Sequence, residues 1–277
     1  MFIGVSYVYE LGEPRRSVLK VDYSPEVNRG SIAFRFLLVI PYLLVYLALL
    51  LFVFLVSPLV WIIALGLGRL PRFGVDLYAY LIGYHARLLT YLYFVSNTHP
   101  PIVGSGIGSK VEVEFFPSRL PRLSILFRLI LAIPALFIGQ ISMSGLPLVG
   151  FFEWLVILVR GDLPKSVFDA NLAVIRFSIR TEAWLLMLSG VYPDGLFGDK
   201  FNYEHHDSAD PNELVGSYEG FSAESPSGQG EVYLNRLSKA IVVICLISGL
   251  AMSFGRGQST NSIVTQTQNS KGVSLSP

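Results

Sequence analysis

The chain carries five apolar stretches separated by more polar segments. They are residues 36–67, 75–96, 129–159, 168–189 and 240–254. About 20 apolar residues span a bilayer, so the pattern predicts an integral membrane protein with five crossings. The first stretch is too long for one upright helix. It is interpreted as an interfacial segment (29–40) and a crossing (42–67), with breaks at Pro41 and Pro58 because proline removes a helix hydrogen bond.

Composition supports this membrane assignment. Only 15% of residues are charged, against about 25% in soluble domains, and the mean hydropathy is +0.54. The net charge of +1 excludes a general nucleic-acid-binding surface. A single cysteine, Cys245, excludes an internal disulfide framework. The N-terminus lacks the pattern of a cleavable signal peptide, so the first crossing is expected to act as an anchor.

The sequence repeats itself at an offset of 93 residues. Of the 72 positions from Arg29 to Pro100, 22 are identical 93 positions later, without a gap. Apolar composition alone would match leucines, but the identities include arginine, aspartate, tryptophan, glycine and proline. Each copy contains an apolar segment, a G-x-L-P turn and a helix studded with polar residues. A repeat of this kind determines the whole fold.

The repeat predicts an all-α membrane protein made of two parallel tandem helical hairpins and a C-terminal transmembrane helix. Two crossings per copy would give the copies the same orientation, with an axis along the membrane normal. A third crossing per copy would invert them, and this alternative stays open. Residues 19–23 and 111–115 alternate apolar and charged residues, as a half-buried strand does, and residues 2–9 could form a third strand. Short strands at the membrane surface are therefore expected, with extended linkers as the alternative.

These tandem units resemble a family of uncharacterised prokaryotic membrane proteins that share a domain of unknown function. The residues that carry the resemblance recur 93 positions later; they are Arg35, Pro41, Gly68 to Pro71, Asp76, Arg87 and Pro100. The resemblance covers about residues 17–193 and implies a bacterial or archaeal cell membrane. It implies no activity, cofactor or catalytic residue. Repeat 2 departs from the pattern at Asp162, Glu153 and Arg176.

Charged residues inside the predicted crossings are the main candidates for function. They are Asp76 and Arg87 in repeat 1 and Glu153, Asp169, Arg176 and Arg180 in repeat 2. Asp76 and Arg87 share one helix face, as do Asp169 and Arg180. Charges in a crossing must face protein, water or each other, so the stripes form either a transport pathway or a helix-to-helix contact. Glu153 and Arg176 are predicted to form a buried ion pair across the hairpin of repeat 2.

Basic residues mark the entry to each apolar segment. Arg29, Arg35, Arg122 and Arg128 are predicted to contact anionic lipid at the interface. Ordinary topology signalling by positive charge is the alternative, and the charge balance favours a cytoplasmic N-terminus.

No metal site or cofactor is predicted. Glu204, His205, His206 and Asp207 are adjacent, but neighbouring side chains point in different directions. They also lie in an acidic segment with the composition of a solvated loop. The chain thus divides into an N-terminal strand-like segment (1–28), repeat 1 (29–100), a linker with a strand (101–121), repeat 2 (122–193), a mobile acidic loop (194–236), a transmembrane helix (237–256) and a disordered tail (257–277).

The expected function is that of a non-enzymatic membrane module. It would act as a scaffold or accessory subunit that binds membrane lipids or another membrane protein. The alternative is a small transporter or channel that uses the two polar stripes, and a lipid-modifying enzyme is a third hypothesis. The expected location is a prokaryotic cell membrane, with several crossings.

Overall fold

The computed structural model describes residues 5–7, 17–21, 23, 29–100, 111–197 and 234–253. The predicted mobile loop and polar tail lie almost entirely outside the described residues. Within them the protein is mostly helical, as the sequence predicted, and it contains a small sheet.

Three helices in the described part of the chain are long and apolar enough to cross a membrane. They are α2 (Arg35–Leu67), α4 (Arg122–Arg160) and a C-terminal helix, Arg236–Ser253. A short helix, α1 (Arg29–Ala33), precedes α2, and the chain turns at Phe34 between them. Pro41 and Pro58 do not break α2, contrary to the prediction. Each proline removes only its own N–H donor, and the other hydrogen bonds of the helix carry it through both positions.

The G-x-L-P turns end these long helices. Gly68 and Gly161 adopt left-handed conformations with φ of 67° and 87°, and their N–H groups bond to Ala64 and Ile157. Glycine adopts this conformation without steric cost. Pro71 and Pro164 then precede α3 (Arg72–Leu92) and α5 (Lys165–Leu185).

Helices α3 and α5 are buried on almost every side. The sequence predicted that both cross the membrane. Each is 21 residues long, but neither is among the helices apolar enough to do so. Their apolar residues serve contacts with protein on two faces. The apolar residues of α3 and α5 therefore indicate burial between two protein layers rather than contact with lipid.

A three-stranded sheet packs against α3 and α5. Strand β3 (Val111–Phe115) lies between β1 (Val5–Tyr7), which is parallel to it, and β2 (Val18–Val21), which is antiparallel. Val111, Val113 and Phe115 are buried, while Glu112 is exposed. The three predicted strand segments therefore contain strands, β1 and β2 with other bounds than predicted, and the predicted alternation is confirmed in β3.

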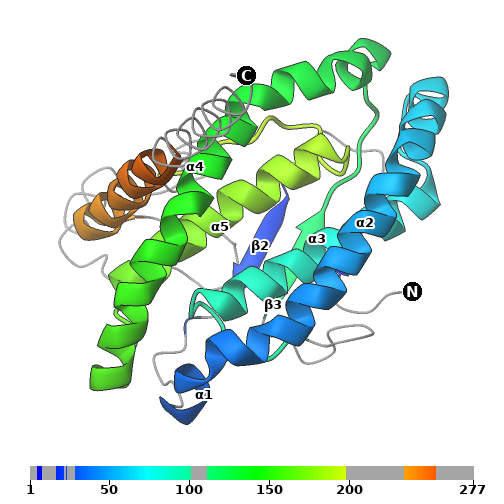
Figure 1. Cartoon of the computed structure of the whole chain (residues 1–277). Coiled ribbons are helices and arrows are strands. Elements are labelled where there is room, and N and C mark those ends of the chain that lie inside the picture. Colours follow the sequence, from blue (N-terminus) through cyan, green and yellow to red (C-terminus); the bar gives the residue numbers. More distant parts are fainter. Residues whose placement is uncertain are drawn as a thin grey trace, which may run out of the picture.

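The elements form three layers (Figure 1). The strands contact α3 and α5, which in turn contact α2 and α4. The C-terminal helix, orange in Figure 1, lies beside α4. Helices α3 and α5 thus form the middle layer, between the sheet and the apolar helices.

The two repeats run in opposite directions. Trp154, near the end of α4, packs against Phe36 at the start of α2, with ring centroids 6.1 Å apart. At the other end, the Leu120 N–H just before α4 donates to the Gly68 carbonyl at the end of α2 (3.1 Å). Helices α2 and α4 are therefore antiparallel, so they cannot both stand upright with the same orientation, as the predicted hairpins would. Within the described residues each repeat contributes one strongly apolar helix rather than two.

Candidate functional site

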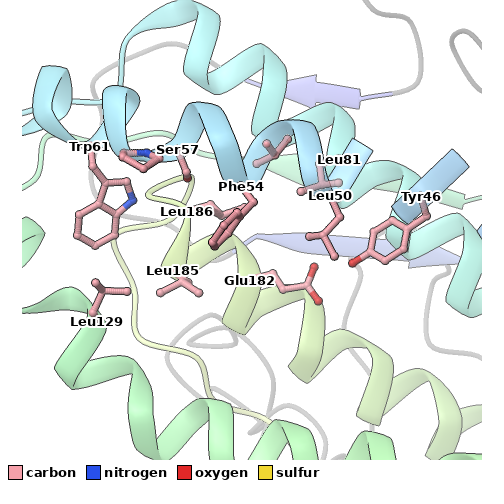
Figure 2. A pocket seen from close by; sticks show the side chains of 12 residues that line it. Tyr46, Leu50, Phe54, Ser57, Trp61, Leu81, Leu129, Glu182, Leu185 and Leu186 are labelled. Atoms are coloured by element: carbon pink, nitrogen blue, oxygen red, sulfur yellow. The ribbon is translucent and has the colours of Figure 1, made fainter. Parts of the chain in front are cut away.

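A cavity of about 640 Å³ lies between α2 and the second repeat. Its walls are almost entirely apolar (Figure 2). Helix α2 supplies most of the lining, and α3, α4 and α5 supply the rest; the lining residues are Tyr46, Leu50, Val53, Phe54, Ser57, Pro58, Trp61, Leu81, Leu129, Glu182, Leu185 and Leu186. Ligand pockets usually measure roughly 300–1,000 Å³, so this volume suits a small molecule.

The cavity is elongated and has one polar end. Tyr46 and Trp61 are 15 residues apart on α2, which corresponds to roughly 22 Å at 1.5 Å per residue. Figure 2 shows Trp61 and Leu129 at one end, and the Tyr46 ring and the Glu182 carboxylate towards the other. Glu182 is the only carboxylate among the lining residues. A long apolar slot with an acid towards one end suits a chain with a polar head.

The acid is held in place by its neighbours. Glu182 Oε2 lies 2.9 Å from His85 Nδ1. This contact connects α5 to α3. The Tyr46 ring stacks on the His85 imidazole, with centroids 4.5 Å apart. Ser178 Oγ makes a longer contact of 3.4 Å with Glu182 Oε1. The second carboxylate oxygen is therefore the more weakly bonded one, and the better placed to accept a hydrogen bond from a ligand.

Repeat 2 fills the corresponding space with aromatic rings. Gly150 and Gly139 are the counterparts of Ser57 and Tyr46 at the offset of 93. A Cβ on Gly150 would lie 3.3 Å from the Tyr93 ring, and one on Gly139 would lie 3.7 Å from the Phe177 ring. The cavity thus arises from a difference between the repeats.

Arg35 and Arg128 lie inside the protein rather than on a lipid-facing surface. Both are completely buried. Arg35 donates to the Tyr91 carbonyl and to Asn97 Oδ1, each at 2.9 Å, and its guanidinium covers the Tyr91 ring at 4.5 Å. Arg128 repeats this arrangement: it donates to the Ser189 carbonyl (2.7 Å) and covers Trp184 at 4.6 Å.

Arg35 and Arg128 hydrogen-bond to backbone carbonyls at or just beyond the C-terminal ends of α3 and α5. Phe94 and Met187, which are counterparts, adopt positive φ of 61° and 65° there. Non-glycine residues rarely hold this conformation unless their surroundings impose it. The sequence predicted that Arg35 and Arg128 touch lipid, and the structure instead places them as anchors. The other two arginines lie at the start of their helices: Arg29 begins α1, and Arg122 is exposed, with a 3.4 Å contact to the Gly66 carbonyl.

The predicted polar stripes face away from α2 and α4. Tyr78 bonds to Ser57 on α2, and Arg87, nine residues later, projects from the opposite face of α3. In repeat 2, Arg176 Nε donates to the Leu19 carbonyl of β2 (3.0 Å), and Arg180 donates to the Asp194 carbonyl (3.2 Å). The stripes are therefore on the sheet side of the middle layer, away from the cavity.

Burial affects the ionisation of these stripes. It lowers the pKa of the Arg87 guanidinium, against the influence of Tyr80 and Tyr84. It raises the pKa of the Asp169 carboxyl, while Lys165 and Arg176 act in the opposite direction. Asp76 is partly buried.

Glu153 and Arg176 do not form the predicted ion pair. Glu153 is buried and accepts a 2.8 Å hydrogen bond from Asn171 Nδ2, which also donates to the Tyr93 carbonyl (3.1 Å). Arg176 is five residues beyond Asn171, so it projects towards the sheet while Asn171 projects towards α4. The prediction considered depth along the helices and ignored direction around them.

The sequence reasoning did not single out the His85–Glu182 pair. A signal was present. At the offset of 93, the counterpart of Glu182 in repeat 1 is position 89, four residues after His85. Residues four apart lie on one helix face, so His85 and Glu182 occupy equivalent faces of α3 and α5. Antiparallel repeats bring these faces together across the middle layer. No metal-binding group of three or more acidic, histidine or cysteine residues occurs in the described ranges.

Comparison with known proteins agrees with the repeat. A family model described as a domain of unknown function (DUF4389) matches residues 29–103 and again residues 122–196. The two matches begin 93 residues apart, which confirms the predicted tandem units. No curated protein and no solved structure matches the chain. Because the two matched stretches make up more than half of the chain, this protein belongs to the DUF4389 family, and it carries two copies of the family's domain.

Proposed function

We propose that this protein is a non-enzymatic membrane module that binds a chain-like amphiphile from the bilayer. The apolar chain would lie along α2, and a cationic, hydrogen-bond-donating head would bind Glu182. The elongated cavity with an acid towards one end carries this proposal. A buried or half-buried carboxylate favours a ligand that brings a compensating positive charge.

The location and wider role are part of the same proposal. The module would sit in a prokaryotic cell membrane and act as a scaffold or accessory subunit of a larger assembly. Three buried charged residues are hydrogen-bonded within the protein; they are Arg35, Arg128 and Glu153. Charges used in this way stabilise the fold, which supports a binding module rather than a transport pathway. A transport function has less support, since Arg87 and Arg180 lie on the face opposite the cavity.

Fluorescence of Trp61 tests the proposal. The chain has three tryptophans, so a Trp154→Phe, Trp184→Phe background leaves Trp61 as the only reporter. The protein is placed in phosphatidylcholine nanodiscs and titrated with brominated dodecylamine, dodecanol and dodecanoate. We expect saturable quenching by the amine at concentrations where the alcohol and the acid quench weakly.

Glu182→Gln should weaken amine binding about tenfold, which corresponds to about 1.4 kcal/mol. That is just below the roughly 1.5–3 kcal/mol given for hydrogen bonds to charged groups. Glu153→Gln makes the same chemical change outside the cavity and should leave binding unchanged. Equal quenching by all three amphiphiles, or an amine affinity insensitive to Glu182→Gln, would contradict the assigned head group. Absence of saturable quenching by any of them would contradict the binding function itself.

A further inference from the structure

The relation between the apolar layer and the sheet determines how the protein sits in the membrane. Helix α2 lies beside α3 over almost its whole length. Arg35 bonds to Tyr91 at one end of the pair, and Val60 faces Gly74 at the other. The 25 residues from Arg35 to Val60 correspond to roughly 38 Å. Helix α3, 21 residues or roughly 31 Å long, therefore runs beside most of α2.

The sheet accompanies the same two helices on the far side. The chain leaves α3 at Leu92, beside the start of α2, and returns to Leu120, which bonds to Gly68 at the end of α2. Strand β3 belongs to this return path and packs on α3. Arg176, in the middle of α5, donates to the Leu19 carbonyl of β2, so the sheet lies beside the middle of the helices.

This sheet is unsuited to hydrocarbon. Glu112 of β3 is exposed, and Lys20 and Glu114 form an ion pair of 2.7 Å with both side chains about one-third exposed. Strands β1 and β2 are the outer strands of the sheet in the described residues. Open sheet edges do not occur in contact with lipid chains, because their backbone groups would lack hydrogen-bond partners. An upright α2 would place these groups at membrane depth.

The opposite face of the molecule has the reverse character. Between residues 36 and 67, α2 has no charged residue, and the one charge of α4 between residues 129 and 159, Glu153, is buried. Large apolar side chains are exposed along both helices, among them Phe54 (72%) and Val159 (78%). An exposed apolar surface of this extent marks an interaction site.

We propose that the three layers stack along the membrane normal. Helices α2 and α4 and the C-terminal helix lie in the plane of the membrane, within one leaflet, and the sheet faces water. A helix is about 10–12 Å across, and half of a roughly 30 Å hydrocarbon core is about 15 Å, so one layer of helices fits in a leaflet. The partner of this surface is the lipid bilayer itself.

The charges around the apolar layer agree with this arrangement. Exposed arginines lie at the ends of the long helices; they are Arg69, Arg72, Arg122 and Arg160. In a flat arrangement all of them reach the headgroups of one leaflet, where anionic lipid attracts basic side chains. Basic residues favour the cytoplasmic leaflet, so the sheet, with the N-terminal strand β1, faces the cytoplasm.

The two G-x-L-P turns provide a matched test, because they lie at opposite ends of the molecule. Single cysteines are introduced as Arg69→Cys, Asp162→Cys and Glu112→Cys in a Cys245→Ala background. Arg69 and Asp162 are counterparts in the two repeats. Sealed membrane vesicles of each orientation are treated with a membrane-impermeant maleimide. We expect all three positions to be labelled from the same side, with loss of labelling in vesicles of the opposite orientation.

Labelling of the two turns from opposite sides would overturn the proposal and show that α2 and α4 cross the membrane. Phe54→Cys tests the lipid-facing layer and should resist the same reagent until detergent is added. Its reaction in intact vesicles would place water on that face. Its crosslinking into dimers would place a second copy of the chain there. Either result would overturn the proposal.

Discussion

Replacement of Arg35 or Arg128 by alanine should destabilise the protein by roughly 2–5 kcal/mol, because truncation of a large buried side chain leaves a cavity and leaves the oxygens that it bonds to without a partner. Each arginine is fully buried, bonds to a carbonyl where a middle-layer helix ends and covers an aromatic ring. The expected result is a large fall in the thermal unfolding midpoint in mild detergent. Because the two sites are repeat counterparts, the two losses should be similar.

Lysine should not restore stability at either position. A lysine ammonium lacks the planar guanidinium that can bond to a carbonyl and stack on a ring together. Arg122→Ala is the matched control: Arg122 is exposed and makes one contact of 3.4 Å, so its loss should change the free energy of unfolding by less than about 0.5 kcal/mol. If Arg35→Ala or Arg128→Ala behaved like this control, the anchoring role would be refuted.

Gly145→Ala should displace the C-terminal helix from α4. A Cβ at Gly145 would lie 1.8 Å from the Cys245 carbonyl oxygen, and one at Gly249 would lie 1.9 Å from the Ile141 carbonyl oxygen. Both obstacles are backbone atoms, so a side-chain rotation cannot relieve them. Overpacking of this kind costs about 1–3 kcal/mol, sometimes more. Hydrogen exchange in Arg236–Ser253 should become much faster.

The control for this change is Gly66→Ala on α2. No atom lies within 4 Å of a Cβ built at Gly66, and alanine favours a helix by up to about 1 kcal/mol over glycine. Gly66→Ala should therefore leave the structure intact or stabilise it slightly. Unchanged hydrogen exchange in the C-terminal helix of Gly145→Ala would mean that the close contact does not hold that helix.

Local features of this fold could be predicted from the sequence. The repeat, the G-x-L-P turns, the alternating strands and the most apolar helices each follow from residues that are close together in the chain. Gly68 and Gly161 end helices because glycine tolerates positive φ, and β3 alternates because one face of the sheet is buried.

Contacts between distant segments could not be predicted in this way. Arg35 and Arg128 have the sequence context of interfacial residues, and only their contacts with Tyr91 and Trp184 show that they are buried. Helices α3 and α5 look like crossings because two other layers cover them. The sequence predicted five crossing segments from apolar content, whereas three helices of the described residues are long and apolar enough to cross.

The cavity was hidden for a related reason. It depends on how two nearly equivalent repeats differ in side-chain volume at positions such as Tyr93 and its counterpart Leu186. The His85–Glu182 pair forms only because antiparallel repeats bring α3 and α5 together. A polar pair that joins two repeats is visible in the sequence only after the repeat axis is known.

The depth of α2 in the bilayer tests the layered arrangement most directly. Spin labels are attached at Leu44, Leu55 and Ile62, three exposed positions on one face of α2, again in the Cys245→Ala background. Their depths are measured from relaxation by oxygen and by a water-soluble nickel complex in lipid vesicles. A helix that lies in the membrane plane predicts nearly equal depths at the three sites. A helix that crosses the membrane upright would spread Leu44 and Ile62 over roughly 27 Å, since they are 18 residues apart at 1.5 Å per residue, and that result would contradict the account.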